Sequence, residues 1–228
     1  MKLLLLAATP PEIASTVAHL RQRAVDGYQN VIRFPRVEIT VLFGGLGLVS
    51  TAYLLGRYFA ANPPTLAIQG GVAGAIDPTL PLTSVVNVTS ERLLDLGAED
   101  RTGSPLTPAE MGLPLGFPFA DDEVLRPPGP AAVLPYPTVA GGTVNRATGT
   151  QRSLDLIRDK FPGVQTESME GAAFFYACMQ AGVEPLQIRS ISNYVGVRDR
   201  SSWRMQEAVA SLNDALIKIL TPFITPLP

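Results

Sequence analysis

Short apolar runs alternate with amphipathic stretches along the chain. The first run, Leu3–Ala8, has the length of a buried strand and ends at a Pro-rich turn. A helical spacing follows over Glu12–Arg23, where prolines are tolerated at the start. The pattern then predicts a strand over Val37–Phe43 and a helix over Leu48–Ala61. The chain is therefore expected to begin strand, helix, strand, helix.

The same alternation continues towards the C-terminus. Further strands are expected at Leu66–Gln69, Ser84–Val88, Val139–Gly142 and Leu186–Ser190, and further helices at Gln151–Phe161, Gly171–Ala181 and Trp203–Leu220. Residues 102–137 are rich in Pro and Gly, and we expect a long insertion loop with short helical turns there. Alternating strands and helices predict an α/β fold, a three-layer α/β/α sandwich around a central mixed, twisted sheet.

Composition and charge narrow the class of protein. The 228 residues, 46% of them hydrophobic, suit a single domain over residues 1–228. A net charge of −2 without a Lys/Arg-rich stretch argues against a nucleic acid partner. No apolar run approaches the ~20 residues that span a bilayer, so no membrane partner is expected. The one cysteine, Cys178, allows no intrachain disulfide, and we expect a cytoplasmic protein.

Two glycine-rich segments follow predicted strands, at Gly44–Gly47 and Gly70–Gly74. We expect tight strand-to-helix turns at both, because glycine lets the backbone approach a neighbour or a ligand closely. Neither segment continues into the Gly-Lys-Ser/Thr of a phosphate-binding loop, and neither has the spacing of a dinucleotide site. No cofactor is implied.

The residues that usually act as nucleophiles are scarce. His19, the only histidine, lies in the first predicted helix, where a surface or boundary position is the simpler interpretation. Cys178 lies in an apolar helix and is expected to be a buried structural thiol. Clusters of His and Cys with metal-ligand spacing are absent from the sequence, so no metal is expected.

Two acids and one amide remain as candidates for chemistry. Glu12 follows the first strand, Glu170 precedes an apolar helix, and Asn193 follows the strand over 186–190. Each also has a simpler interpretation, as a first-turn glutamate, a helix cap and a turn residue respectively. The residues alone therefore indicate an enzyme or binding protein with acid chemistry at strand ends.

Several segments together resemble the purine nucleoside phosphorylase and methylthioadenosine/S-adenosylhomocysteine nucleosidase superfamily. Glu167–Ala173, ESMEGAA, is similar to its Met-Glu-Gly-Ala-Ala signature, and Ile188–Asn193, IRSISN, to its Ile-Arg-x-Ile-Ser-Asp segment. Gly70–Gly74 is similar to its Gly-x-Ala-Gly turn, and the first strand with Glu12 to the nucleosidase start. The order and spacing of these pieces make the resemblance specific over almost the whole chain.

The resemblance implies a role for each matching residue. Glu170 would bind the ribose hydroxyls, with Met169 packed on the sugar, and Glu12 would polarise the attacking water. Ser192 and Asn193 would face the purine. Further substrate contacts are expected from the turn residues Gly71, Val72 and Ala73, from Asn145 in the loop over 143–150, and from Ser168. Superfamily members complete their pockets at subunit contacts, so a homo-oligomer, at least a dimer, is expected.

Two residues bear on the type of reaction. A negative Glu12 at the nucleophile position would repel phosphate, and the turn after the first strand has no arginine, so water is the expected nucleophile. Adenine-cleaving nucleosidases carry an aspartate where this chain has Asn193. An amide cannot act as a general acid but can donate a hydrogen bond to O6 of a 6-oxopurine, which indicates hypoxanthine as the leaving group.

Three further segments resemble futalosine hydrolases in particular. The matching segments are Leu94–Asp100 (LDLGAED), Thr143–Gly149 (TVNRATG) and Ser192–Arg204 (SNYVGVRDRSSWR). The resemblance implies hydrolysis of futalosine, a small nucleoside with a benzoate-bearing 5′ extension, in a route to menaquinone. Arg198 or Arg200 could pair with that carboxylate, although either could also be a solvated loop charge. A methylthioadenosine/S-adenosylhomocysteine nucleosidase, a phosphorylase and a non-catalytic nucleoside-binding protein remain as alternatives.

Overall fold

The computed structural model describes residues 1–128 and 134–225. The strands are β1 (Lys2–Ala7), β2 (Asp26–Tyr28), β3 (Val31–Arg33), β4 (Glu38–Phe43), β5 (Leu66–Ala75), β6 (Val85–Leu93), β7 (Ala98–Glu99), β8 (Pro105–Leu106), β9 (Val124–Leu125), β10 (Thr138–Thr143), β11 (Thr166–Ser168) and β12 (Glu184–Tyr194). The helices are α1 (Ala14–Arg23), α2 (Leu48–Ala61), α3 (Gln151–Lys160), α4 (Gly171–Ala181) and α5 (Met205–Ile224), with 3₁₀ turns at Pro10–Ile13 and Arg200–Ser202.

One mixed sheet forms the centre of the molecule. Its strand order is β11-β10-β6-β12-β5-β1-β4-β3-β2, and β9 pairs with β6 beside this path. β1 is parallel to β4 and β5, and β12 is parallel to β5, whereas β6 runs antiparallel to β12. The mixed sheet between helices confirms the α/β fold class expected from the sequence.

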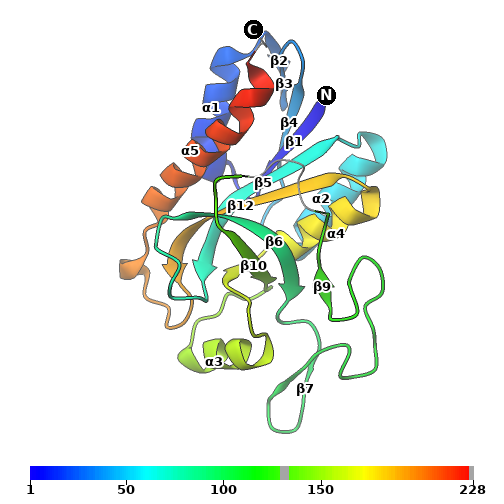
Figure 1. The fold of residues 1–228 in the computed structure, drawn as a ribbon, viewed down its shortest axis with the longest axis vertical. Helices are drawn as coiled ribbons and strands as arrows, with labels where there is room; N and C mark the ends of the chain where they lie inside the picture. The colour runs from blue at the N-terminus through cyan, green and yellow to red at the C-terminus, as the bar shows by residue number, and fades with distance from the viewer. Residues whose placement is uncertain (129–133, 226–228) are drawn as a thin grey trace.

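Helices cover both faces of this sheet (Figure 1). Alternate residues of a strand point to opposite faces, and β1 divides in this way. Leu3 and Leu5 pack with α1 and α5, whereas Leu4 and Leu6 pack with α2 and α4. The near-continuous apolar run at the start of the chain therefore reflects a strand that is buried on both sides.

Three central strands are longer than the hydrophobic pattern predicts. β5 continues through Gly70–Gly74, so the expected turn at these glycines is wrong. A Cβ on Gly70 would lie 2.7 Å from Leu216 Cδ1, and one on Gly74 would lie 2.7 Å from Val195 Cγ2. Glycine is needed at these two positions because neighbouring side chains pack directly against the strand backbone. It is not needed for a turn of the chain.

Other differences concern short or irregular elements. The hairpin of β2 and β3 and the short strand β11 were not predicted, since each is only three residues long. The first helix begins as a 3₁₀ turn and becomes α-helical at Ala14. The described part of the 102–137 insertion contains turns and the short strands β8 and β9 but no helix. No helix in the described ranges has the length and apolarity that crossing a membrane requires.

Asn213 of α5 fastens the start of α1 to the rest of the fold. Its side chain is 3% exposed, and its Oδ1 accepts hydrogen bonds from the backbone N and the Oγ1 of Thr16, both at 2.8 Å. Its Nδ2 donates to the carbonyl oxygen of Glu12 at 2.8 Å and to that of Val209 at 2.7 Å. One buried amide thus fixes the backbone that carries Glu12.

Replacing Asn213 should test this anchor. Asn213→Ala would leave buried donors and acceptors unpaired on two other elements, and we expect the free energy of unfolding to fall by about 3 kcal/mol. Urea denaturation followed by circular dichroism measures it. Asn62→Ala, at the exposed end of α2, is the control and should change the free energy by less than about 0.5 kcal/mol. Equal effects of the two changes would contradict the anchoring role.

Candidate active site

A cavity of about 230 Å³ opens where the carboxyl ends of β1, β5 and β12 meet the loop before α4. Such strand ends are the usual location of ligand sites in α/β sheets. Of the residues predicted from the sequence, the structure places these along its wall: Glu12, Val72, Ala73, Ser168, Met169, Glu170, Ser192, Asn193 and Arg198. Segments from Glu12 near the start of the chain to Arg198 near its end therefore meet at one place.

Glu12 is held at the cavity by its own turn. The backbone N and the Oγ1 of Thr9 donate to its Oε2, at 2.7 and 3.0 Å. The prolines at 10 and 11 suit this turn, because the first positions of a helical turn need no backbone donor. Glu12 is therefore a first-turn acid, as its simpler interpretation has it, and it also forms a capping box with Thr9. Its Oε1 is left on the side of Gly71.

Gly71 lies behind Glu12 and is not part of the cavity wall. A Cβ at this position would lie 2.3 Å from Arg189 Nη1 and 3.3 Å from Glu12 Oε1. The guanidinium of Arg189 and the carboxylate of Glu12 thus converge on the space that Gly71 leaves free. Gly71 therefore allows these two side chains to approach each other inside a strand. From the sequence we expected it to contact the substrate from a turn.

Arg189 is a component of the site that the sequence analysis missed. It is 2% exposed, its Nε donates to Gln187 Oε1 and its Nη2 donates to Gln69 Oε1, both at 3.0 Å. Buried arginines are rare unless they are paired or hydrogen-bonded. A charged residue in the middle of the apolar strand over 186–190 was the signal that could have identified it.

Glu170 occupies the opposite wall, at the N-cap position of α4. Its side chain is 5% exposed, and its Oε1 accepts a hydrogen bond of 2.9 Å from the backbone N of Gly47. Gly47 has a φ of +86°, a conformation that glycine adopts readily. The glycine-rich turn at 44–47 thus holds one oxygen of this carboxylate.

Glu167 is a further acid of the same signature that the sequence analysis did not single out. The backbone N of Thr148 donates to its Oε1 at 3.0 Å, and Thr148 Oγ1 donates to its Oε2. Burial raises the pKa of Glu167, and the two bonds from Thr148 oppose that rise. Both residues line the cavity, so Glu167 fastens the loop over 143–150 to the site.

Asn145 does not line the cavity, although other residues of the loop over 143–150 do. Its backbone N donates to Asp95 Oδ2 at 2.6 Å, and its Nδ2 lies 3.3 Å from Asp95 Oδ1. Ala147 and Thr148, and not Asn145, line the cavity. The side chain of Asn145 is thereby tied to the segment over 94–100.

Ser192 and Asn193 are brought to the cavity by an irregularity of β12. The pairing of β12 with β5 shifts register between Ile191 and Asn193. The Ser192 hydroxyl donates to Asn193 Oδ1 at 2.8 Å, and Asn193 Nδ2 donates to the carbonyl oxygen of Tyr194 at 3.1 Å. These bonds orient the amide, and its NH₂ group has a second hydrogen for a ligand.

Arg198 and Trp203 form the outer edge of the cavity. The Cζ of Arg198 lies 5.1 Å from the centre of the Trp203 ring, and the Cζ of Arg200 lies 5.7 Å from the same ring. Arg198 is exposed, and both it and Trp203 line the cavity. The backbone N of Arg204 donates to the carbonyl oxygen of Ser192 at 2.8 Å, which holds this loop close to Asn193.

The histidine and the cysteine of the chain lie outside the cavity wall. His19 is in α1, away from the cavity wall, and burial together with Arg23 lowers its pKa. Burial raises the pKa of the thiol of Cys178, a residue of α4 whose side chain is buried in the core. Within residues 1–128 and 134–225 the structure shows no group of three His, Cys, Asp or Glu side chains that could hold a metal ion.

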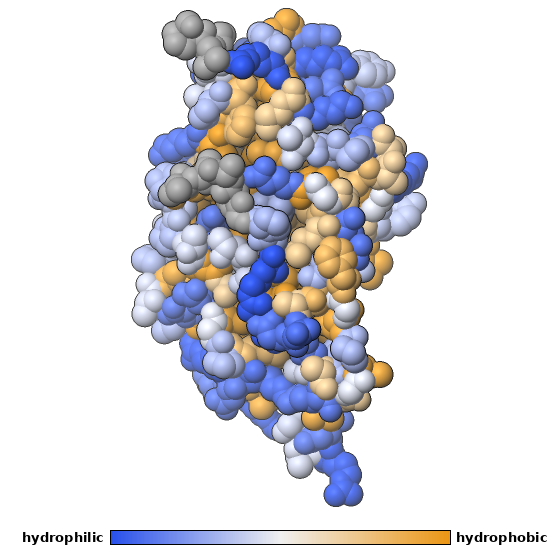
Figure 2. Space-filling view, turned by 45° about the vertical axis from the view of Figure 1, so that its right-hand side comes forward, coloured by the Kyte–Doolittle hydropathy of each residue, from blue (hydrophilic) through white to orange (hydrophobic). Residues whose placement is uncertain are grey.

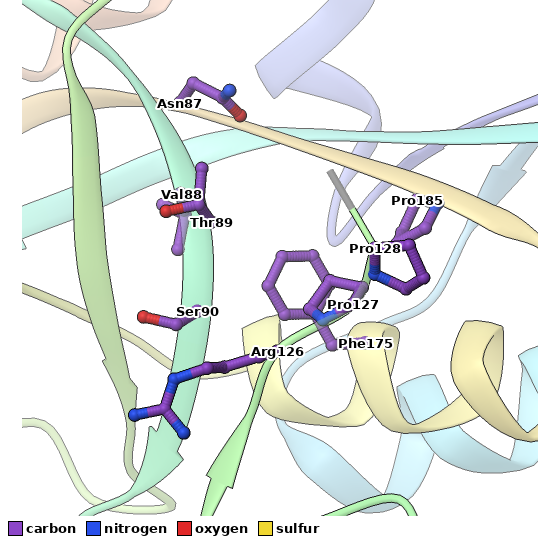
Figure 3. Close-up of a pocket in the computed structure, with 9 residues that line it drawn as sticks. All are labelled: Asn87, Val88, Thr89, Ser90, Arg126, Pro127, Pro128, Phe175 and Pro185. Atoms are coloured by element: carbon purple, nitrogen blue, oxygen red, sulfur yellow. The ribbon is translucent and has the colours of Figure 1, made fainter. Parts of the chain in front are cut away.

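A second cavity, of about 370 Å³, lies between β6 and the start of β12 (Figure 3). Its wall consists of Asn87, Val88, Thr89, Ser90, Arg126, Pro127, Pro128, Phe175 and Pro185. Arg126 is its one charged residue, and it already forms two hydrogen bonds to Asp122, at 2.7 and 2.6 Å. Acids and amides converge on the first cavity, which is therefore the candidate active site.

The chain is similar over most of its length to a known protein family and to several known proteins. The model of the Phosphorylase superfamily matches residues 2–225. Futalosine hydrolase of Streptomyces coelicolor is 36% identical over 69% of this chain and 66% of its own length, and that of Thermus thermophilus is 32% identical over 77% and 78%. A methylthioadenosine/S-adenosylhomocysteine nucleosidase of Marinomonas is 25% identical over 93% of this chain and 94% of its own length.

Solved structures show the same fold. S-adenosylhomocysteine nucleosidase of Streptococcus pyogenes, in complex with 5-methylthiotubericidin, superposes with a TM-score of 0.78 at 20% identity, over 100% of this chain and 98% of that chain. The methylthioadenosine/S-adenosylhomocysteine nucleosidase of Colwellia psychrerythraea, in complex with adenine, gives 0.75 at 19% identity, over 98% and 96%. The chain therefore belongs to the Phosphorylase superfamily and is an N-glycosidic hydrolase within it.

Proposed function

We propose that this protein hydrolyses the N-glycosidic bond of futalosine. The products would be hypoxanthine and dehypoxanthinylfutalosine, and the enzyme would act in the cytoplasm in the futalosine route to menaquinone. The observation that carries the proposal is the convergence of Glu12, Glu170 and Asn193 on one cavity. Three futalosine hydrolases at 31–36% identity support the choice of substrate.

Glu170 is the proposed ribose ligand. A carboxylate accepts hydrogen bonds from two neighbouring hydroxyls, and charge-assisted bonds of this kind are strong. The bond from Gly47 holds the group in one orientation before the substrate arrives. Met169 lines the cavity next to it and would pack on the sugar ring.

Glu12 is the proposed general base for water. Thr9 occupies its Oε2, so its Oε1 would accept the proton of a water placed between it and the sugar. Arg189 Nη1 lies on the same side of Gly71 as Glu12 Oε1. This arginine comes from β12 and not from the turn after β1. Glu12 and Glu91 are both carboxylates near this one guanidinium, and we expect the site to favour water over phosphate.

Asn193 is the proposed purine-binding residue. Cleavage leaves negative charge on the departing base, and hydrogen bonds to that base stabilise it. The Asn193 NH₂ group would donate to O6 of hypoxanthine, since Ser192 occupies the carbonyl oxygen of the amide. An exocyclic amino group, as in adenine, would face a donor and bind less well.

Arg198 and Trp203 are the proposed contacts for the 5′ extension. An exposed guanidinium above an indole ring offers a charge for a carboxylate and a flat surface for an aromatic ring. Both lie on the cavity wall with Met205. A benzoate would thus meet a matching pair of groups at the outer edge.

A homo-oligomer is proposed from the face of α2. Val49 and Tyr53 are 81% and 69% exposed, and Leu46 at the start of the same face is 68% exposed and lines the cavity. Figure 2 looks onto the side that carries α2 and α4, where apolar residues lie between charged ones. A second subunit on this face would bury these side chains and border the active site.

Base release from three nucleosides tests the proposed reaction. Purified protein is incubated with futalosine, inosine or methylthioadenosine, with and without phosphate, and bases are measured by chromatography. We expect hypoxanthine from futalosine at a rate independent of phosphate, and a kcat/KM at least about tenfold above that of inosine. Glu12→Gln should lower kcat by about a hundredfold, since a general base is lost.

The same assay separates the alternatives. Adenine from methylthioadenosine would indicate the second type of nucleosidase, to which relatives at 25–28% identity belong. Base release only with phosphate would indicate a phosphorylase, and nucleoside binding without release a binding protein. Arg198→Ala should raise KM for futalosine but not for inosine, and equal changes for both would remove Arg198 from the 5′ subsite.

Asn193→Asp should shift base selectivity. A carboxylate in this place accepts from the amino group of adenine and repels O6, so adenine release from methylthioadenosine should rise, and hypoxanthine release fall, each by about tenfold. Initial rates with both substrates measure the shift. Asn193→Ala is the control and should lower both rates, and an unchanged preference in the aspartate variant would show that Asn193 does not read the base.

Tyr53→Glu should disrupt the proposed subunit contact. Light scattering after size exclusion should give at least twice 24.3 kDa for the wild type and 24.3 kDa for the variant, because a charge would be buried in the interface. Tyr28→Glu, an equally exposed tyrosine in β2, is the control and should leave the mass unchanged. A wild type of 24.3 kDa would contradict the oligomer.

A further inference from the structure

Glu91 is a buried acid outside the cavity wall whose position the proposed reaction does not explain. It lies in β6 and is 1% exposed. Its carboxyl group is enclosed by two glycines: a Cβ on Gly141 would lie 2.6 Å from its Oε1, and a Cβ on Gly171 would lie 1.9 Å from it. The backbone of β10 and of α4 thus leaves room for this one side chain.

Glu91 is connected to the start of α4 through Thr143. Thr143 Oγ1 donates to Glu91 Oε2 at 2.9 Å and accepts from the backbone N of Ala172 at 2.8 Å. A hydroxyl has one hydrogen, so donation to Glu91 turns its lone pairs towards the helix N-terminus. Glu170 directly precedes this N-terminus, and its carboxylate therefore depends on the same contacts.

Glu91 also lies close to Gln187, one of the two amides that hold the Arg189 guanidinium. A Cβ on Gly171 would lie near both Glu91 Oε1 and Gln187 Oε1, and Gln187 Oε1 accepts from Arg189 Nε at 3.0 Å. Charged neighbours come from two elements, Arg189 from β12 and Glu170 from α4, whereas β9 and β10 carry no titratable side chain. Burial raises the pKa of Glu91 to about 7. The charge of Arg189 and the hydrogen bond from Thr143 oppose this rise, and the charge of Glu170 adds to it. This carboxyl group therefore changes its charge near neutral pH.

We propose that Glu91 is a positioning residue that links the two walls of the active site. Through Thr143 it sets the start of α4, which holds Glu170, and through its charge it holds Arg189 at the place next to Glu12. The inference rests on the proposed hydrolysis, in which Glu170 binds the ribose and Glu12 activates water. Glu91 itself touches no substrate.

The two connections predict different kinetic effects. Thr143→Val removes the cap on α4 and should raise KM about tenfold with a smaller change in kcat, because the ribose contact loosens. Glu91→Gln keeps an oxygen for Thr143 but removes the charge that balances Arg189, and should lower kcat about tenfold with a smaller change in KM.

The dependence on pH separates positioning from a purely structural role. Below neutral pH, Glu91 is protonated and Arg189 loses its partner, so kcat of the wild type should rise from about pH 6 to about pH 8. In Glu91→Gln this rise should be absent. A raised pKa in the folded state means that deprotonation costs stability. Over the lower half of this range, up to the folded pKa of about 7, the variant should therefore lose less melting temperature than the wild type.

The experiment measures kcat and KM for futalosine and inosine across this pH range, together with thermal melts. Glu123→Gln replaces another buried glutamate, in the insertion, and serves as the matched control with wild-type kinetics. Wild-type kinetics and an unchanged pH profile in Glu91→Gln would overturn the inference. The inference would also be overturned if Glu91→Gln lost activity only in proportion to the fraction of folded protein and kept the wild-type pH profile.

If the proposed hydrolysis itself is wrong, the same experiment gives a different result. The wild type itself would then release no base from either nucleoside. Inosine binding measured by calorimetry still tests the link in that case, because Thr143→Val should weaken binding about tenfold through Glu170. Binding as tight as that of the wild type would overturn the connection between Thr143 and Glu170.

Discussion

The buried guanidinium of Arg189 is the group on which the rest of the site depends. Among the described residues it is the one Lys or Arg that is almost fully buried. Removing such a charge from water costs several kcal/mol unless carboxylates and hydrogen bonds compensate. Gln69 and Gln187 supply the bonds, Glu91 supplies charge, and Gly71 leaves the space. The requirement to satisfy one cation thus specifies residues on three neighbouring strands.

The second wall of the site follows from a helix N-terminus. α4 begins inside the protein, where its first backbone donors have no water to bond. Ser168 Oγ accepts from the backbone N of Gly171 at 3.3 Å, and Thr143 accepts from that of Ala172. Glu170 stands immediately before them and is held by Gly47 from another loop. The contacts that cap the start of α4 therefore also place the Glu170 carboxylate at the cavity.

The two walls have different consequences for chemistry. The Glu12 side combines a carboxylate with a nearby guanidinium, which suits the activation of a small nucleophile. On the Glu170 side, the backbone N of Gly47 holds the carboxylate in one orientation. Asn193 and Arg198 add a neutral and a positive group to the cavity wall.

The sequence by itself determined the fold class, the order of the main helices and the candidates Glu12, Glu170 and Asn193, because hydrophobic period and strand-end position are local properties. It did not reveal that Gly70–Gly74 lies within β5, since glycine serves a tight turn and a close approach equally well. It also did not identify Arg189, Glu91 or Thr143 as one group. Only the tertiary structure decided this, because these residues belong to strands that are distant in the chain and become neighbours when the sheet forms.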